Sequence, residues 1–199
     1  MTIAVVQYNA GNIQSLLFAL QRLGIHPCIS DDARVLRSAD KVIFPGVGEA
    51  RSAMTYLRER GLDTVITSLQ QPVLGICIGM QLLCAYSEEQ HTECMGVFDA
   101  RVQRLVPVIE GQKRLKVPHI GWNIVQTRPH PLFAHLPSEF YAYYVHSYAV
   151  EPVPETIATT TYTRTFSSAL HSNNFYAVQF HPEKSGEVGM QVLKNFLEL

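Results

Sequence analysis

The sequence lacks several features that mark common classes of protein. Its 199 residues contain no long apolar run and no basic tract, and the formal net charge is −1. These absences argue against a membrane span and against a nucleic-acid-binding surface, so we expect neither a membrane nor a nucleic acid as a partner. The N-terminal residues lack a basic region followed by a cleavage site, and a secretory signal is therefore not expected.

The cysteines also lack the spacings that identify other classes. Cys28, Cys77, Cys84 and Cys94 form neither a CxxC pair nor the framework of a small disulfide-rich domain, so we expect reduced thiols in a cytoplasmic protein. The chain contains no P-loop and no GxGxxG motif. We expect no cofactor and no metal site.

The first half of the chain alternates short apolar segments with amphipathic ones. With 47% hydrophobic residues, the chain can bury a sizeable core. Strands are predicted at residues 3–7, 28–29, 41–44 and 73–76. Helices are predicted at residues 13–23, at 49–60 and from Met80 onward. This alternation predicts an α/β fold with an open, mostly parallel sheet and helices on both faces.

After about residue 100 the chain becomes rich in β-branched and aromatic residues. Strands, several of them antiparallel, are predicted at residues 102–106, 117–127, 140–150, 157–163 and 175–180. A helix at 189–199 closes the chain. No Gly/Ser-rich linker interrupts it, so we expect residues 1–199 to form a single domain with an antiparallel, β-rich second half.

Residues 75–83 read GICIGMQLL and place Cys77 in the G-x-C-x-G pattern of a nucleophile elbow. In such an elbow, a strained turn between strand and helix lifts the nucleophile clear of the sheet, and the flanking glycines avoid clashes. A helix N-terminus after Cys77 favours a thiolate and offers N–H groups to an oxyanion. The alternative is a buried structural cysteine in a glycine-rich turn.

A base for this cysteine is predicted after the last strand. His181 follows that strand directly, at the edge where active sites of open α/β sheets lie. Pro182 favours an extended His181, and in an extended segment Glu183 lies on the same side as His181. Glu183 can then hold one imidazole nitrogen and leave the other for Cys77. Alone, His-Pro-Glu is more often an ordinary loop, and its weight comes from coinciding with the elbow.

The segments GICIGMQ and QFHPEKS resemble the class I (triad) glutamine amidotransferases, which carry a Cys-His-Glu triad on a flavodoxin-like sheet. Four further segments are similar to the glutaminase subunits of imidazole glycerol phosphate synthases in histidine biosynthesis: YNAGNIQSL, FPGVGEA, KVPHIGWN and YYVHSYAV. The resemblance covers essentially the whole chain. One departure is Gln7, where that family usually has an aspartate.

The resemblance implies that Cys77 attacks the side-chain amide of L-glutamine, forms a thioester and releases ammonia, assisted by His181 and Glu183. It implies oxyanion donors at Ile78 and in the Val47–Gly48 segment. Residues expected to hold glutamine are Gly46, Gln81, Ser147 and Tyr148. The alternatives are an ordinary turn for the PGVG segment and a solvent-exposed helix position for Gln81.

The resemblance also implies a partner, the cyclase subunit, which is a (β/α)₈ barrel that receives the ammonia in a heterodimer. The interface is expected to include His119, Trp122, Asn123 and Lys184. Trp122 could instead pack in the chain's own core, and Lys184 could be a solvated surface lysine.

Other functions stay open at the level of sequence. A different glutaminase of the superfamily, such as one serving pyridoxal phosphate or anthranilate synthesis, would keep the triad and change the acceptor. A γ-glutamyl peptidase would hydrolyse its substrate without a partner. A non-catalytic binding module is the weakest alternative, because all three triad residue types are present.

Overall fold

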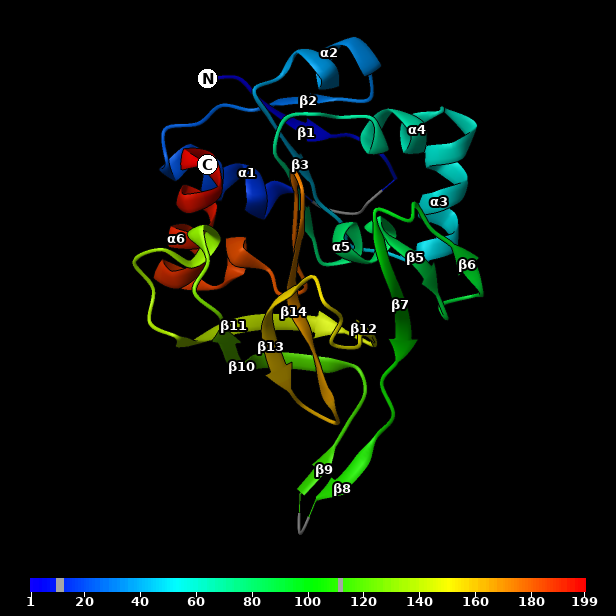
Figure 1. Ribbon diagram of the computed structural model, residues 1–199, viewed down its shortest axis with the longest axis vertical. Helices are drawn as coiled ribbons and strands as arrows, with labels where there is room; N and C mark the ends of the chain where they lie inside the picture. The colour runs from blue at the N-terminus through cyan, green and yellow to red at the C-terminus, as the bar shows by residue number, and fades with distance from the viewer. Residues whose placement is uncertain (10–12, 111–112) are drawn as a thin grey trace.

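The computed structural model describes residues 1–9, 13–110 and 113–199. A large sheet runs through the centre of the molecule (Figure 1). Its parallel half consists, in spatial order, of β2 (Cys28–Ser30), β1 (Ile3–Val6), β3 (Lys41–Phe44), β4 (Val73–Ile76) and β15 (Phe175–Val178). The sheet continues antiparallel through β14 (Thr165–Ser172), β13 (Thr156–Thr161), β10 (His119–Thr127) and β11 (Glu139–His146). The predicted fold class is confirmed.

Helices cover both faces of the parallel half. One core cluster joins the sheet to α1 (Gln14–Arg22) and α6 (Gly186–Glu198). The cluster on the opposite face includes residues of α2 (Ala33–Ser38), α3 (Ala50–Glu59), α4 (Leu62–Thr67) and α5 (Ile78–Leu83). Figure 1 shows the two groups on either side of the sheet.

Strand β1 shows why the central strands read as continuous apolar runs. Ile3 and Val5 belong to one core cluster, whereas Ala4 and Val6 belong to the other. Successive side chains of a strand point to opposite faces, so a strand with helices on both sides must be apolar at every position.

A smaller sheet lies beside the large one. It consists of β12 (Tyr148–Val150), β7 (Phe98–Arg104), β5 (Cys84–Ser87) and β6 (Thr92–Glu93). A hairpin of β8 (Val108–Glu110) and β9 (Lys113–Leu115) projects away from the body of the molecule (Figure 1). The single strand predicted at 140–150 is therefore wrong, because the chain leaves the large sheet at Ser147 and Tyr148 pairs with Arg104 of β7.

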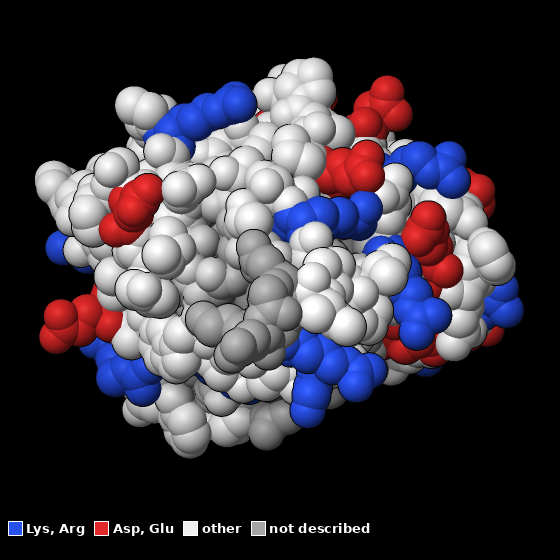
Figure 2. Space-filling model, turned by 90° about the horizontal axis from the view of Figure 1, so that it is seen from below, with Lys and Arg blue, Asp and Glu red and all other residues white. Residues whose placement is uncertain are grey.

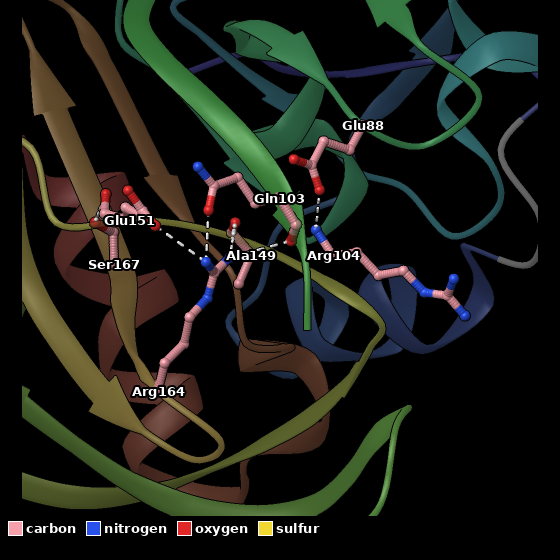
Figure 3. Close-up of polar contacts among 7 residues, drawn as sticks. All are labelled: Glu88, Gln103, Arg104, Ala149, Glu151, Arg164 and Ser167. Atoms are coloured by element: carbon pink, nitrogen blue, oxygen red, sulfur yellow. Dashed lines mark hydrogen bonds and ion pairs between the residues drawn. The ribbon is translucent and has the colours of Figure 1, made fainter. Parts of the chain in front are cut away.

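Arg164 fastens the two sheets together next to β12. It follows β13, and its guanidinium donates to Gln103 Oε1 at 2.5 Å and to Glu151 Oε1 at 3.1 Å (Figure 3). A weaker contact of 3.5 Å reaches the carbonyl of Ala149. Because Ala149 adjoins Tyr148, this cluster helps to place the segment that forms one wall of the cavity described below.

The surface carries no dominant charge on the face viewed in Figure 2. Lys and Arg side chains alternate there with Asp and Glu and with uncharged areas, in keeping with the net charge of −1. Among the helices of the described residues, none is long and apolar enough to cross a membrane.

Candidate active site

Three neighbouring strands of the large sheet bring the predicted site together. β4 lies between β3 and β15, and all three run parallel. The chain continues from β3 into Pro45–Gly48, from β4 into Cys77, and from β15 towards His181. Segments distant in sequence therefore meet at the carboxyl edge of the sheet, where open α/β folds place their ligands.

Cys77 sits in a strained turn between β4 and α5. Its φ is 53° and its ψ is −109°, a backbone conformation that costs a non-glycine residue about 1–3 kcal/mol. The Cys77 N–H donates to the carbonyl of Val178 at 2.8 Å. A Cβ on Gly79 would stand 2.0 Å from the carbonyl oxygen of Phe44, so only glycine fits there. These features are those of a nucleophile elbow.

Glu183 reaches His181 by a different route from the predicted one. His181 itself is extended, but Pro182–Lys184 form a 3₁₀ turn, so the expectation of an extended segment is wrong beyond His181. The turn nevertheless brings Glu183 Oε1 to 2.7 Å from His181 Nδ1. The other ring nitrogen, Nε2, is buried and lacks a hydrogen-bond partner among the described residues.

The surroundings of His181 favour its protonated form. Burial alone lowers its pKa, because His181 is only 1% exposed. The negative charges of Cys77 and Glu183 outweigh burial and raise the pKa of His181 to about 10. An imidazolium beside the sulfur is the partner with which a cysteine thiolate forms an ion pair.

A cavity of about 290 Å³ opens in front of Cys77. Most of the residues predicted for catalysis and binding line it: Val47, Gly48, Cys77, Ile78, Gln81, Ser147 and Tyr148. Gly46 is an exception and lies behind the wall. A Cβ on Gly46 would stand 1.9 Å from Ile78 Cγ2 and 2.3 Å from the Tyr8 hydroxyl, so its role is to let these segments approach.

Gln81 is buried rather than solvated, which rules out the alternative of an exposed helix position. Its side chain is on α5 and its residue is 3% exposed. Nε2 donates to the Tyr148 carbonyl at 3.0 Å and to Gln179 Oε1 at 2.9 Å. Gln179 in turn directs its own amide at Cys77 Sγ, 3.7 Å away.

The cavity also contains residues that sequence reasoning missed. Glu89 lines it from the turn after β5, where Oε2 accepts a hydrogen bond from the Ala50 N–H at 2.8 Å. Burial raises the pKa of this carboxyl group, and the hydrogen bond opposes that effect. His146 and Pro118 line the cavity as well. Glu89 lies in the polar segment SEEQ, which looks like any surface turn.

The residues predicted for a partner interface do not lie at the same depth. Trp122 is 56% exposed, so the alternative that it packs in the chain's own core is wrong. It lies on β10 opposite Tyr143, and Lys184 is exposed with Nζ 6.0 Å from the Tyr143 ring. Asn123 is partly buried. His119 is only 3% exposed, so it supports this surface from beneath instead of forming it.

We expect the free energy of unfolding to fall as the pH is lowered from about 7 to 4. Burial lowers the pKa of His119 and of His130 to about 4, and that of His146 to about 3. Unfolded histidine has a pKa of about 6.5, so in this range the unfolded chain binds more protons and stability rises with pH. Urea unfolding at several pH values measures the slope. His130→Asn should reduce it, whereas His26→Asn, at an exposed position, should not; equal slopes would contradict the expectation.

A strained cysteine, a buried histidine–carboxylate pair and an adjoining cavity are the arrangement of a cysteine-dependent amide hydrolase. Comparison with known proteins agrees: the family model "Glutamine amidotransferase class-I" matches residues 5–199. The chain therefore belongs to the class-I glutamine amidotransferases.

Within that family, the similar curated proteins are HisH subunits of imidazole glycerol phosphate synthase. The subunit from Bacteroides fragilis (strain YCH46) is 54% identical over 100% of both chains. The subunit from Pasteurella multocida (strain Pm70) is 45% identical over 98% of this chain and 97% of its own. The prediction of a glutamine amidotransferase of this kind is confirmed, and a γ-glutamyl peptidase or non-catalytic module is disfavoured.

Solved structures share the fold at lower sequence identity. A putative GMP synthase protein from Thermoplasma acidophilum matches with a TM-score of 0.76 and 22% identity, over 100% of this chain and 93% of its own. A structure described as a glutamine amidotransferase matches with a TM-score of 0.74 and 19% identity, over 98% and 97%.

Proposed function

We propose that this chain hydrolyses L-glutamine at Cys77 and delivers the ammonia to a cyclase subunit that forms imidazole glycerol phosphate. The observation that carries the proposal is the 2.7 Å contact between His181 and Glu183 next to Cys77, at the cavity lined by Gln81 and Tyr148. The full-length similarity to HisH subunits supports the choice of acceptor. We place the reaction in the cytoplasm, where the four free cysteines would stay reduced.

In the proposed reaction the Cys77 thiolate attacks the side-chain carbonyl carbon of glutamine. His181 gives its proton to the departing nitrogen, the C–N bond breaks and ammonia leaves a γ-glutamyl thioester. His181 then takes a proton from water, and the resulting hydroxide releases glutamate and restores the thiolate. Glu183 holds the imidazole in the orientation that both steps need.

The negative charge on the tetrahedral intermediate needs hydrogen-bond donors. The N–H of Ile78, next to the nucleophile at the start of α5, is one proposed donor. The second is a peptide N–H of the Val47–Gly48 segment. Val47 lines the glutamine cavity on one side and a small cavity of about 20 Å³, shared with His181, on the other. Gly48 has a φ of 136°, which suits glycine and allows its peptide more than one orientation.

Glu89 is proposed to bind the ammonium group of glutamine, because it brings a carboxylate to the cavity that holds Cys77. We expect Glu89→Gln to raise the KM for glutamine about 10–100-fold with little change in kcat, since it removes a hydrogen bond between charged groups. Glu88→Gln is the matched control, because Glu88 is exposed and accepts from the Arg104 N–H (Figure 3). Equal KM values in the two variants would contradict this role.

The proposed docking surface for the cyclase is the exposed side of β10 and β11. Ile120, Trp122 and Tyr141 are between 56% and 60% exposed there. Aromatic side chains are frequent anchors of interfaces, and Lys184 adds a charge at the border of this surface. By resemblance, Lys184 would form a salt bridge to the barrel where ammonia enters.

One experiment tests the function as a whole. The assembled enzyme is given glutamine, and glutamate and the cyclase product are measured together. Equal amounts of the two are expected. Glutamate formation that neither requires nor feeds the cyclase would instead indicate a hydrolase that works alone.

A further inference from the structure

A chain of hydrogen bonds connects the glutamine cavity with strand β10, and the proposed mechanism does not use it. The Tyr148 carbonyl lies 2.8 Å from His146 Nδ1. The other nitrogen of that ring, Nε2, lies 3.0 Å from His119 Nδ1. His119 Nε2 lies 3.3 Å from the side-chain amide nitrogen of Asn123.

The acceptors in this chain determine where the protons are. A carbonyl can only accept, so His146 carries its proton on Nδ1 and accepts on Nε2. His119 must then donate from Nδ1 and accept on Nε2. The Asn123 amide fits this order, because its nitrogen also donates to the Thr161 carbonyl and its oxygen accepts from the Ile124 N–H. All four ring nitrogens are paired when both histidines are neutral.

The surroundings of the two histidines keep them neutral and fixed. His119 is stacked between the rings of Tyr144 and Tyr162, with centroid distances of 4.9 and 4.0 Å. Phe166 packs edge-on against His146 at 5.1 Å. Both histidines are buried, and an apolar enclosure disfavours the imidazolium.

On the cavity side, the chain ends at a junction. The Tyr148 carbonyl that accepts from His146 also accepts from Gln81, and Gln81 holds the Gln179 side chain that points at Cys77 Sγ. A displacement of the Tyr148 carbonyl would therefore change the position of a side chain that lines the substrate cavity. His119 itself lies outside that cavity.

We propose that His119 and His146 are positioning residues, which hold the Tyr148 carbonyl, and through it Gln81, in the geometry that glutamine requires. The inference rests on the proposed function, in which this cavity binds L-glutamine. Asn123 extends the same chain to β10, whose exposed side carries Trp122. A partner that docks on that side can therefore act on the substrate cavity through the histidine pair.

The test compares two substitutions of His119 in the complex with the cyclase. His119→Asn keeps a donor where Nδ1 stood, whereas His119→Phe keeps the stacked ring and loses both hydrogen bonds. We expect His119→Phe to raise the KM for glutamine about 5–10-fold, as for the loss of one or two neutral hydrogen bonds, and His119→Asn to raise it less. Ammonia-dependent synthesis, which needs no glutamine, should stay at the wild-type rate in both.

A role in packing alone predicts the opposite order, because phenylalanine fills the space between Tyr144 and Tyr162 and asparagine does not. The proposal is overturned by that order, by equal KM values in both variants, or by wild-type values in both. Long-range ¹H–¹⁵N spectra of the unmodified protein near pH 7 should show the Nδ1–H tautomer for His119 and His146, and an Nε2–H tautomer for either would also overturn it. Absence of glutamine turnover in the wild-type complex would instead count against the proposed function.

Discussion

Replacing Cys77 with alanine should abolish glutamine-dependent synthesis of imidazole glycerol phosphate, by about 10⁴-fold or more, and should leave ammonia-dependent synthesis intact. The loss is expected because no other side chain at the cavity can form the thioester. Free ammonia bypasses that step, so the cyclase still has its nitrogen donor. The measurement is product formation by the assembled complex, with glutamine or with an ammonium salt as the nitrogen source.

Cys84→Ala is the matched control for this substitution. Cys84 is also buried, but it lies in ordinary extended backbone, and burial keeps the pKa of its thiol well above the usual range. It should therefore be inert, and both nitrogen sources should support wild-type rates. Glutamine-dependent activity that survives in Cys77→Ala, or is lost in Cys84→Ala, would show that the nucleophile has been assigned to the wrong residue.

The isolated chain should release glutamate slowly, and the cyclase with its nucleotide should accelerate it about 10²–10³-fold. The expected cause is the Val47–Gly48 peptide, which must aim an N–H at the oxyanion before the hole is complete. Loss of one such donor costs about that factor. The partner needs to favour the active orientation by only a few kcal/mol, which is the scale of ordinary allosteric coupling. Steady-state glutamate release is measured with the chain alone, with the cyclase, and with cyclase and nucleotide.

Gly48→Ala tests the backbone explanation without introducing a clash. An added Cβ would meet no atom within 4 Å, so the substitution changes only which φ values are favourable. Gly96→Ala is a suitable control, because Gly96 has a φ of 70°, is equally open and lies outside the cavity lining. We expect Gly48→Ala alone to reduce the activation. Similar glutamate release in all three conditions by the wild type would remove the case for a gated oxyanion hole.

The parallel half of the fold could be predicted because its strands carry an unambiguous pattern. The ranges predicted for β3 and β4 coincide with those observed, since both strands are apolar throughout and buried on both faces. β14 was missed because its TFSSALHS sequence contains small polar residues. Two of these, Ser167 and Ser168, are fully buried and hydrogen-bonded to other side chains, a contact that periodicity cannot reveal.

Other elements were missed for lack of length. α2 and α4 have six residues each, too few to show a helical period. The break at Ser147 has no breaker residue, and it depends on the pairing of Tyr148 with a distant strand.

The candidate site shows a similar division. The positions of Cys77 and His181 follow from local patterns at the ends of strands, and these could be read directly. Glu89 and the buried state of His119 depend on how distant segments pack, and a polar turn or a histidine in a strand gives no sign of either. The 3₁₀ turn at Pro182–Lys184 was mistaken for extended chain because proline is compatible with both conformations.

The most direct test of the account is to locate the covalent intermediate. The complex with cyclase and nucleotide is quenched in acid during glutamine turnover, digested, and its peptides are analysed by mass spectrometry. The account predicts a γ-glutamyl group on Cys77 and on none of Cys28, Cys84 and Cys94. A γ-glutamyl group on another cysteine, or sustained turnover in Cys77→Ala, would contradict it.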